Sequence, residues 1–359
     1  MKIACTNCGQ KYPDSGMPYQ CPNCGGLFDL AAPLTFNLPP STSNRPGIWR
    51  YASSFDLDVA PVSLGEGNTP LVPAKAFGRE VFFKCEYSNP SGSFKDRGSA
   101  TLVAAMKARG VTEAIEDSSG NAGASFAAYA ARAGIKARVF VPESASGPKR
   151  LQIEMYGAEL IPVPGPRANA SEAVRKAAEA GMIYASHAYL PFNIPGYATC
   201  AYEIVEQLGR APGAVIIPAG QGGLVLGMGR GFEAMLNADM VENMPMLVGV
   251  QASACQPLVA LWNHGTMDGV SDNQTVAEGV RGRSLRAKAV VEMTRRSGGR
   301  FMSVDEAFIL SGRDALARLG FYVEPTSALV WHALEENILS LPDPVVVVLT
   351  GSGLKSLSE

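Results

Sequence analysis

Short, continuously apolar segments alternate with helical patterns along most of this chain. The strand candidates are Val81–Tyr87, Glu113–Ser118, Ala137–Pro142, Glu159–Pro164, Ala214–Pro218, Met246–Ala252 and Val345–Thr350. The helical patterns between them include Asn121–Ala133, Ser171–Ala180, Gly196–Leu208 and Val304–Leu319. Apolar strands that alternate with helices are typical of parallel sheets covered by helices on both faces. The sequence therefore predicts an α/β protein.

The chain is long enough for more than one folding unit. It has 359 residues, and most single domains are shorter. Residues 1–30 form a short segment that carries cysteines, and residues 31–46 are rich in proline and serine, as a linker would be. The alternation of strands and helices begins after Trp49. We therefore expect a small N-terminal unit, a linker and a larger α/β body.

Charge and hydropathy narrow the classes of partner. The formal net charge of −2 at pH 7 gives no basic surface for nucleic acid or for an anionic membrane. The N-terminus lacks the apolar core of a signal peptide, and no apolar run approaches the ~20 residues that span a bilayer. We expect a soluble, cytoplasmic protein that binds neither nucleic acid nor membrane.

Four of the seven cysteines form two closely spaced pairs near the N-terminus. Cys5 and Cys8, and then Cys21 and Cys24, are each separated by two residues, and twelve residues lie between the pairs. This spacing predicts a tetrahedral, structural Zn²⁺ site of the zinc-ribbon kind. One interpretation is a ribbon that binds nucleic acid or a partner. We favour the other, a zinc-stapled module packed on the body, because so small a unit needs a metal and few basic residues accompany it.

A lysine in a loop of small residues is the first candidate for chemistry. Lys95 lies within Asn-Pro-Ser-Gly-Ser-Phe-Lys-Asp-Arg-Gly, residues 89–98, between the strand candidate 81–87 and a helical pattern at 99–109. A lysine at such a turn loses part of its hydration, which favours the neutral amine that forms a Schiff base with a carbonyl. Most lysines are solvated surface groups, so this assignment depends on the motifs that follow.

Two further loops are suited to binding anions. Residues 118–123, Ser-Ser-Gly-Asn-Ala-Gly, lie at the start of a helix and offer backbone N–H groups to a carboxylate. An ordinary turn capped by serine and asparagine is an equally good interpretation. Residues 220–224, Gly-Gln-Gly-Gly-Leu, open a helix after a buried strand, as a phosphate cradle does. A dinucleotide fingerprint is the alternative there, but its third glycine would fall at Val225.

A hydroxyl group follows the last apolar strand. Residues 345–349 run directly into Thr350-Gly-Ser-Gly-Leu-Lys. A threonine at this position is placed to meet a ring nitrogen and, unlike an aspartate, would leave a pyridine nitrogen unprotonated. Ligands of open α/β sheets bind at the carboxyl ends of strands, so we expect the lysine, the two loops and the threonine to serve one ligand.

These residues resemble fold-type II pyridoxal-phosphate (PLP) enzymes, and within them the threonine synthase group. The resemblance covers residues 47–359, where the motifs follow the family's order. The motifs are Gly65-Glu66-Gly67-Asn68-Thr69-Pro70-Leu71, Ser93-Phe94-Lys95-Asp96-Arg97-Gly98, Ser118-Ser119-Gly120-Asn121, the glycine loop at 220–224, Glu324-Pro325-Thr326-Ser327-Ala328 and Thr350-Gly351-Ser352-Gly353-Leu354-Lys355. The N-terminal cysteine unit also resembles that of some threonine-synthase-like proteins.

The resemblance implies a role for each motif. Lys95 is the implied Schiff-base lysine and proton shuttle, Asn121 is implied to bind the cofactor's 3-hydroxyl, and Thr350 its pyridine nitrogen. The implied phosphate ligands are Gly220, Gln221, Gly222, Gly223 and Leu224. The residues expected to bind the substrate are Ser118, Ser119, Gly120 and Asn121.

The resemblance also implies an architecture. We expect a tryptophan synthase β-like, two-domain fold in which residues 47–97 and 201–359 form a large PLP-binding domain and residues 98–200 a small nested domain. The cofactor is expected in the cleft, and a homodimer is the implied assembly. The zinc-ribbon-like unit, 1–30, and the linker, 31–46, precede these domains.

One segment departs from the family's pattern. Threonine synthases commonly carry an Asn-Ser-x-Asn-Pro-x-Arg-like stretch whose arginine helps to hold the substrate phosphate. The corresponding segment here, residues 186–196, contains no arginine. The pairs Lys149 and Arg150, or Arg281 and Arg283, are alternative sources of charge, although solvated surface cations are the simpler interpretation of both. His187 is either an acid or base or a loop residue without chemistry.

The leading functional hypothesis is a PLP-dependent lyase that converts O-phospho-L-homoserine and water to L-threonine and phosphate. The alternative is β-elimination or β-replacement on a serine-, threonine- or phosphoserine-type amino acid, as in dehydratases or cysteate-synthase-like enzymes. The missing arginine is the main support for this alternative. A third hypothesis, a zinc-ribbon protein whose enzyme-like body is only a binding module, is disfavoured because Lys95, Asn121 and the glycine loop are intact.

Overall fold

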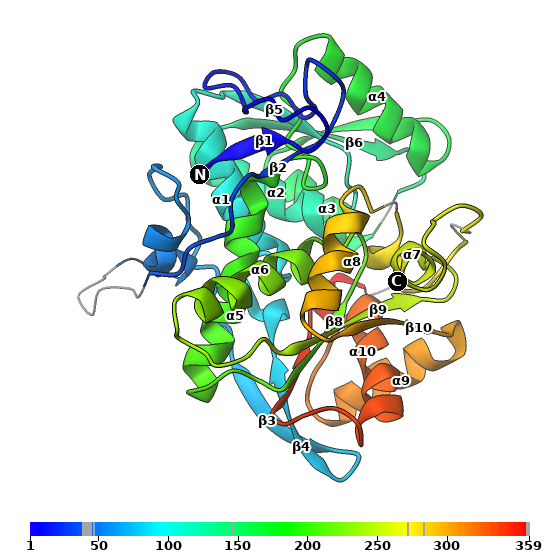
Figure 1. Cartoon of the computed structure of the whole chain (residues 1–359). Coiled ribbons are helices and arrows are strands. Elements are labelled where there is room, and N and C mark those ends of the chain that lie inside the picture. The colour runs from blue at the N-terminus through cyan, green and yellow to red at the C-terminus, as the bar shows by residue number, and fades with distance from the viewer. Residues whose placement is uncertain (38–44, 46, 146, 271–272, 283, 357–359) are drawn as a thin grey trace. The chain divides into compact units, whose positions relative to one another are not determined.

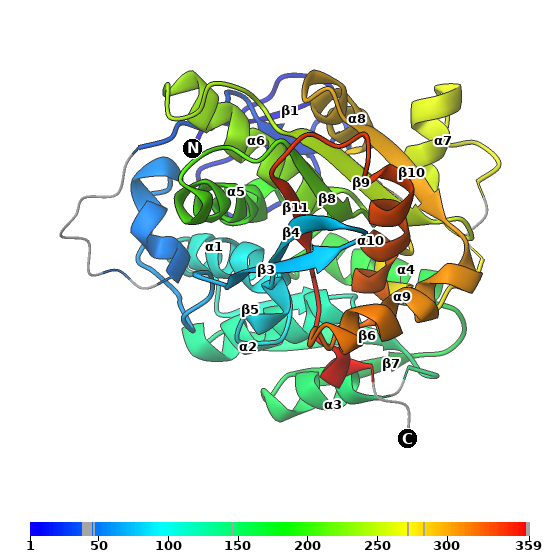
Figure 2. The same cartoon turned by 90° about the horizontal axis from the view of Figure 1, so that it is seen from below.

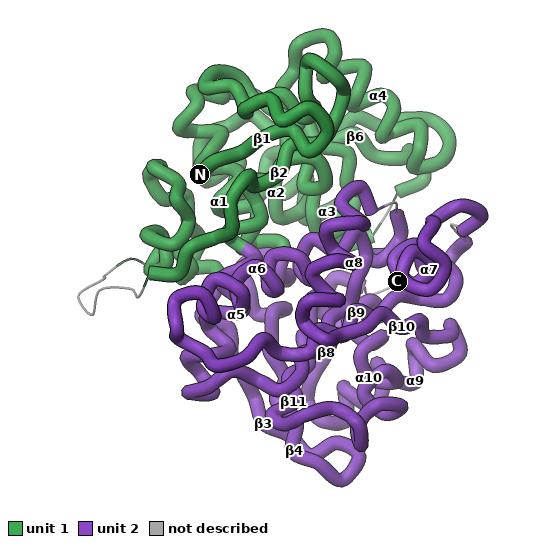
Figure 3. Tube along the Cα trace, in the orientation of Figure 1, with its two compact units in different colours: residues 1–66, 95–196, 357–359 green, residues 67–94, 197–356 purple. Residues whose placement is uncertain are grey.

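The chain divides into two compact units (Figure 3). Each unit contains a β-sheet whose strands are mostly parallel. The computed structural model describes residues 1–37, 45, 47–145, 147–270, 273–282 and 284–356. Unit 1 contains residues 1–66 and 95–196, and unit 2 contains residues 67–94 and 197–356. The chain therefore leaves unit 1, returns to it, and then completes unit 2.

These boundaries can be compared with the predicted domains. The predicted nested domain starts at residue 98 and ends at 200, whereas the chain re-enters unit 1 at 95 and leaves it after 196. Residues 1–30 and 47–66 lie in the same unit as this segment, although the predicted division placed 47–66 in the large domain. Of the predicted linker, residues 38–44 and 46 lie outside the described residues. The division into domains stays a prediction.

Unit 2 is built on a six-stranded sheet in the order β10-β9-β8-β11-β4-β3. The strands are β3 (Leu71–Ala76), β4 (Arg79–Lys84), β8 (Ala214–Pro218), β9 (Met246–Ala252), β10 (Arg300–Val304) and β11 (Val345–Val348). Only the edge pair β3 and β4 is antiparallel among these neighbours. The central strands β8 and β11 are buried along their whole length, as their unbroken apolar sequences require.

Helices cover both faces of this sheet. They are α5 (Ile194–Leu208), α6 (Gly223–Asn237), α7 (Pro257–His264), α8 (Ala287–Arg296), α9 (Glu306–Arg318) and α10 (Pro325–Asn337). Val248 and Val250 of β9 share a core cluster with Leu329 of α10, whereas Leu247 of the same strand lies against Gly229 of α6. Successive residues of a strand point to opposite faces, so α10 and α6 cover different sides. Helices α9 and α10 lie side by side (Figures 1 and 2).

Unit 1 has a three-stranded parallel sheet in the order β5-β6-β7. Its elements are the strand pair β1 (Ile3–Cys5) and β2 (Phe28–Leu30), α1 (Lys95–Ala108), β5 (Glu113–Glu116), α2 (Asn121–Ala133), β6 (Lys136–Pro142), α3 (Pro148–Met155), β7 (Glu159–Val163) and α4 (Arg167–Glu179). Ile115, Val174 and Tyr184 form a small core between this sheet and α4. The carboxyl end of β5 leads through a four-residue loop into α2, and this loop carries the predicted substrate-binding residues.

The predicted α/β class with parallel sheets is confirmed, and each of the seven strand candidates overlaps a strand. The strand predicted at 81–87 ends at Lys84 because a short 3₁₀ helix, Glu86–Ser88, follows. The helix predicted from Ser99 begins at Lys95. Edge strands β3 and β10 were missed because exposed or half-buried residues interrupt their apolar pattern.

Within the described residues, none of the helices combines the length and the hydropathy that a membrane span requires.

Candidate active site

Lys95 is the first residue of α1, and its side chain is half-buried. The next two side chains, Asp96 and Arg97, are fully buried. Asp96 Oδ1 accepts a 2.6 Å hydrogen bond from Ser125 Oγ of α2. Gly196 approaches so closely that a Cβ at this position would lie 1.9 Å from the carbonyl oxygen of Arg97. Contacts on two sides therefore fix the first turn of α1, from which Lys95 projects.

The loop at 118–121 is held by a hydrogen bond within the loop and by close packing, and no side chain at the N-cap position caps the helix that follows. The N-cap of α2 is Gly120, and no side chain at this position caps the helix. Ser118 Oγ instead accepts the N–H of Gly120 at 3.2 Å. Gly123 packs against the loop, since a Cβ there would lie 1.8 Å from the carbonyl oxygen of Ser118. The uncapped N-terminus of α2 is suited to an anion.

Sequence reasoning missed a buried carboxylate beside this loop. Glu116, the last residue of β5, accepts the backbone N–H of Ser118 on Oε2, and its Oε1 lies 2.7 Å from Nδ1 of His187. Burial raises the pKa of Glu116 to about 7, while the Ser118 amide and the charges of Arg167 and Lys95 oppose this rise. A carboxylate directly before the serine loop was visible in the sequence, but its histidine partner lies 71 residues away.

The glycine loop at 220–224 connects β8 to α6 in unit 2. Gly222 is the N-cap of α6, has a φ of +82°, and provides no side chain to the helix amides. Its neighbours leave no room for larger residues, because a Cβ on Gly222 would lie 2.7 Å from Val290 and one on Gly220 would lie 2.8 Å from the carbonyl oxygen of Gly279. The loop therefore exposes backbone N–H groups at a helix N-terminus, as phosphate sites do.

Thr350 lies two residues beyond the end of β11 and is buried. Its Oγ1 is 2.9 Å from Oγ of Ser327 in the motif at 324–328, and its carbonyl oxygen accepts the N–H of Phe94, the residue before Lys95. Thr326 of the same motif accepts the N–H of Gly279, which touches the glycine loop. Three predicted motifs of unit 2 are thus connected to one another.

A buried hydroxyl accompanies these motifs. Ser93 is fully buried, and its Oγ has no hydrogen-bond partner in the part of the chain that the structure describes. Ser93 pairs with Gly351 in an isolated β-bridge. An unsatisfied buried hydroxyl is costly, so its presence next to the segment that follows β11 indicates a polar group of a ligand.

The motif at 65–71 is held by a buried ion pair rather than exposed for chemistry. Lys84 Nζ lies 2.8 Å from Glu203 Oε2 and donates to the carbonyl oxygen of Thr69 at 2.8 Å. Glu203 Oε1 accepts the N–H of Asn68 at 2.7 Å. Asn68 has a φ of +53°, a strained conformation that this contact holds in place. The residues of the motif that lie in unit 2 therefore serve to build the loop.

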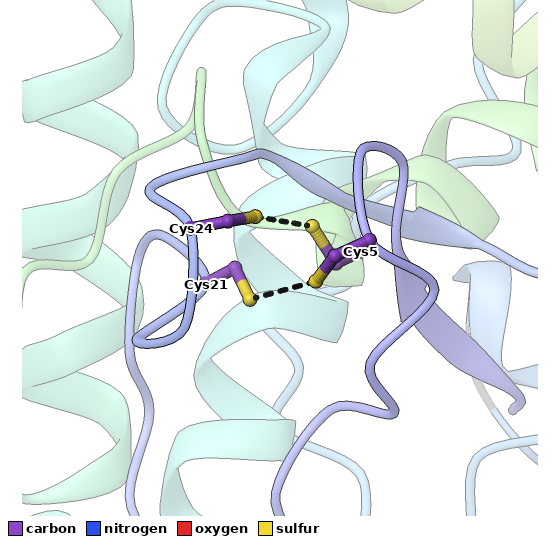
Figure 4. A group of neighbouring side chains, drawn as sticks. Cys5, Cys21 and Cys24 are labelled. Carbon is purple, nitrogen blue, oxygen red and sulfur yellow. Dashed lines mark hydrogen bonds between the residues drawn. The ribbon is translucent and has the colours of Figure 1, made fainter.

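The four predicted metal ligands form a compact cluster (Figure 4). The Sγ atoms of Cys5 and Cys24 are 3.5 Å apart, those of Cys8 and Cys21 are 3.6 Å apart, and all four lie within 4.8 Å of one another. Sulfurs around a tetrahedral Zn²⁺ lie about 3.8 Å apart, given Zn–S bonds of about 2.3 Å. A hydrogen bond from the backbone N–H of Gln10 is the main influence that lowers the pKa of the Cys8 thiol to about 6, and this favours the metal-binding thiolate. The donor set fits a structural metal ion.

The cysteine unit packs on the C-terminal end of α1. Arg109 donates to the carbonyl oxygens of Pro13, Asp14 and Gly16 at 2.9–3.1 Å, and its guanidinium lies 5.1 Å from the ring centroid of Tyr12. A cavity of about 630 Å³ is lined by the cysteine unit and by residues 105, 108 and 109. Residue 105 is about 15 Å along the helix from Lys95 at 1.5 Å per residue, so this cavity is separate from the lysine.

The cations predicted as substitutes for the missing arginine lie in two different segments. Arg150 pairs with Glu154 at 3.6 Å and donates to the carbonyl oxygen of Ala145, so its guanidinium supports the start of α3. Arg281 lies in the segment whose Gly279 and Ser284 touch the glycine loop. Arg283 lies outside the described residues.

A further cation was missed by sequence reasoning. Arg167 is the exposed first residue of α4, where a positive charge opposes the helix dipole. Its charge acts on Glu116 and on His187, as does that of Lys95.

The fold and these sites define a fold-type II PLP-dependent enzyme. Residues 62–351 match the pyridoxal-phosphate dependent enzyme family, to which this chain therefore belongs. The chain is 32% identical to a threonine synthase of Methanocaldococcus jannaschii, over 98% of this chain and 92% of that protein. It is 34% identical to a threonine synthase of Mycobacterium bovis, over 89% of this chain and 91% of that protein.

Solved structures agree with this fold. Maize serine racemase matches with a TM-score of 0.69 and 21% identity over 79% of this chain and 89% of that one. A threonine deaminase from T.th. matches with a TM-score of 0.68 and 27% identity over 81% of this chain and 94% of that one. The uncapped helix N-termini, the glycine cradle and the buried Ser93 hydroxyl fit a phosphate-bearing cofactor such as PLP.

Proposed function

We propose that this chain is a threonine synthase, which converts O-phospho-L-homoserine and water to L-threonine and phosphate. The observation that carries the proposal is similarity to proteins of that name along almost the whole chain, the cysteine unit included. The position of Lys95 at the start of α1 and the glycine cradle at the start of α6 support it. The cytoplasmic location and the homodimer stay predictions.

The family resemblance, together with the chemistry of each position, assigns the cofactor-binding residues. Lys95 would hold the cofactor covalently, and Asn121 would bind its 3-hydroxyl. The backbone amides of residues 220–224 would bind its phosphate, and the hydroxyl of Thr350 would meet its ring nitrogen. The 118–121 loop binds the substrate carboxylate at the N-terminus of α2.

Lys95 also moves the protons of the reaction. Bound PLP supplies an electron sink for the carbon that carries the substrate amino group. Lys95 Nζ takes the proton from the substrate Cα. Loss of phosphate from Cγ also requires removal of a proton from Cβ, and protons then return to Cγ and Cα as water adds at Cβ. The fixed first turn of α1 keeps Nζ in place for both transfers, because Asp96 and Arg97 are buried beside it.

The cysteine cluster binds Zn²⁺ as a structural staple. Four thiolates leave no open position for catalysis, and Arg109 links the carbonyl oxygens of this unit to the end of α1. Metal analysis of the purified protein should give one zinc per chain. Cys8→Ser should lower this content, whereas Cys255→Ala, outside the cluster, should leave it unchanged. Equal zinc in both variants would contradict the assignment.

The experiment that tests the function measures two products together. The purified holoenzyme should release inorganic phosphate and L-threonine from O-phospho-L-homoserine in equal amounts. Lys95→Ala should lose both products and the visible absorbance of the bound cofactor. Turnover retained by Lys95→Ala would overturn the role of this lysine, and phosphate released without threonine would overturn the reaction.

A second candidate is β-elimination or β-replacement on a serine- or threonine-type amino acid. The absence of arginine from residues 186–196 favours it, and the 27% identity to a threonine deaminase is in keeping with it. Release of ammonia and a 2-oxo acid from serine or threonine, with no reaction of O-phospho-L-homoserine, would decide for this candidate.

A further inference from the structure

Glu116 and His187 form a buried pair of titratable groups that the proposed reaction leaves unused. The Glu116 side chain is 1% exposed and that of His187 is 17% exposed, and 2.7 Å separates Oε1 from Nδ1. The pair is held from both sides, because Oε2 of Glu116 accepts the Ser118 amide and the carbonyl oxygen of His187 accepts from Asn193 Nδ2 at 2.6 Å. These contacts keep the carboxyl group and the imidazole together.

The neighbouring buried carboxylate, Asp117, has hydrogen-bond partners of a different kind. Asp117 accepts a 2.5 Å hydrogen bond from Ser171 Oγ on one oxygen and a 2.7 Å hydrogen bond from the Tyr184 hydroxyl on the other. Both of its partners are neutral hydroxyls that do not titrate near neutral pH. Glu116 differs because its partner is an imidazole, which can donate or accept the proton between them.

Positive charges from two helices act on this pair. The charges of Lys95 on α1 and Arg167 on α4 lower the pKa of both Glu116 and His187, while Asp117 acts in the opposite direction on His187. Burial is the largest influence on each, raising the pKa of Glu116 to about 7 and lowering that of His187 to about 3. The pair consequently gains one proton, not two, when the pH falls through neutrality.

We propose that the hydrogen-bonded Glu116–His187 pair stores one exchangeable proton and so sets the charge near the first turn of α1, which the Asp96–Ser125 hydrogen bond joins to α2 and which carries Lys95. This inference rests on the catalytic role proposed for Lys95. When the pair has released its proton, it carries one negative charge and favours the Lys95 ammonium. When it has taken a proton, it is neutral and favours the free amine. When the pair takes a proton from solvent, an O–H bond forms on Glu116, the Nδ1–H bond of His187 breaks and an Nε2–H bond forms, so that Nδ1 becomes the acceptor of the Glu116 hydrogen bond.

Glu116 and His187 are therefore positioning residues that act through Lys95. Whether the pair holds its extra proton determines which imidazole nitrogen carries hydrogen. The ring of His187 therefore reports the protonation state of the pair. Above the transition Nδ1–H donates to the ionised carboxylate, and below it the protonated carboxyl donates to Nδ1 and the hydrogen of the ring moves to Nε2. This change of tautomer leaves the imidazole uncharged.

The test compares two full-length variants that both lack the covalent link to the cofactor. The protein has three histidines, so histidine-labelled samples give three ring signals in an NMR pH titration, and His187→Asn identifies the one of interest. Lys95→Arg keeps the positive charge and Lys95→Met removes it. The midpoint of the His187 transition should be higher in Lys95→Met than in Lys95→Arg by about one pH unit, since one unit charge acts at short range in a partly buried site. Glu116→Gln should abolish the transition.

Equal midpoints in Lys95→Met and Lys95→Arg would overturn the proposal, as would a transition that survives Glu116→Gln. Lys107→Met removes an exposed charge from the same helix and should leave the midpoint unchanged. Arg167→Gln, an exposed change that does not endanger folding, should raise the midpoint and gives an independent test if a Lys95 variant fails to fold. Loss of threonine formation in the wild type would refute the proposed function, but not this coupling.

Discussion

A buried pair of titratable side chains occurs in each unit, and the two pairs differ in how their charges are compensated. In unit 2, Lys84 and Glu203 are 0% and 1% exposed, and Lys84 Nζ has Glu203, the carbonyl oxygen of Thr69 and Gln207 Oε1 as partners within 2.9 Å. All three N–H groups of the ammonium therefore have an acceptor. In unit 1, Glu116 faces an imidazole that burial keeps neutral.

The difference separates a structural pair from one suited to proton transfer. Lys84 and Glu203 have opposite full charges 2.8 Å apart, so each compensates the other's loss of hydration. Glu116 has no full positive charge as its direct partner, and its pKa is raised to about 7, where a small change of surroundings changes its charge. Shifted pKa values of this kind gather at functional sites.

The largest expected effect comes from breaking the satisfied pair. Lys84→Met leaves Glu203 buried without a counter-charge and removes the ammonium from Thr69, so the free energy of unfolding should fall by about 3–5 kcal/mol. Urea unfolding measures this loss. Replacing both partners, as Lys84→Met with Glu203→Leu, should cost less than Lys84→Met alone. A Lys84→Met protein with wild-type stability would show that the pair is not structural.

Glu116→Gln should instead change how stability depends on pH. Because the pKa of Glu116 is raised in the folded protein, its contribution is fully present below about pH 4.5 and is lost as pH rises through about 7. A rise from 4.5 to about 7, at about 1.4 kcal/mol per pH unit, corresponds to at most about 3.5 kcal/mol. The free energy of unfolding of the wild type, compared with that of Glu116→Gln, should therefore fall as the pH rises from 4.5 to about 7.

The shifted pKa of His187 should change the free energy of unfolding with pH in the opposite direction. Burial lowers the pKa of His187 to about 3, so its contribution is present above about pH 6.5 and is lost as pH falls toward 3. His187→Asn should remove that acid-side loss. Unfolding curves of the two variants at pH 4, 5.5 and 7.5 separate the contributions, and pH-independent differences for both would contradict the assigned shifts.

Gly123→Ala tests whether the loop beside Glu116 depends on close packing. The new Cβ would lie 1.8 Å from the carbonyl oxygen of Ser118, so the loop must move, at a cost of about 1–3 kcal/mol. Cofactor affinity, followed by visible absorbance, should fall with stability. Ala131→Gly on the exposed face of the same helix should cost about 1 kcal/mol without affecting the cofactor. Equal cofactor binding in both variants would show that the loop position is unimportant.

The smallest effect is expected at a pair that is not buried. Lys176 and Glu172 of α4 lie 2.8 Å apart, but their side chains are 72% and 57% exposed. Lys176→Met should leave the free energy of unfolding nearly unchanged because water already screens the pair. A loss as large as that of Lys84→Met would mean that distance, not burial, determines the strength of these pairs.

Local patterns carry the predictions of the site. Lys95 and the two anion-binding loops are predicted because small residues follow apolar strands, and the cysteine cluster, which the structure brings together, because its spacing is that of a metal site. The missed positions have no local signal. Glu116 precedes the serine loop like any polar residue at the end of a strand, and Arg167 resembles an ordinary surface cation at the start of a helix.

The sequence by itself determined the α/β class and the order of the strands along the chain, because apolar periodicity and turn residues act over a few neighbouring positions. The residues that hold PLP and zinc stay predictions from the same local patterns. The tertiary structure decided which charges are buried and what they face. Glu116 meets His187 across 71 residues, and Lys84 meets Glu203 across 119. The charge state of such groups depends on burial and on partners brought from distant segments, and these exist only once the sheets and helices have packed.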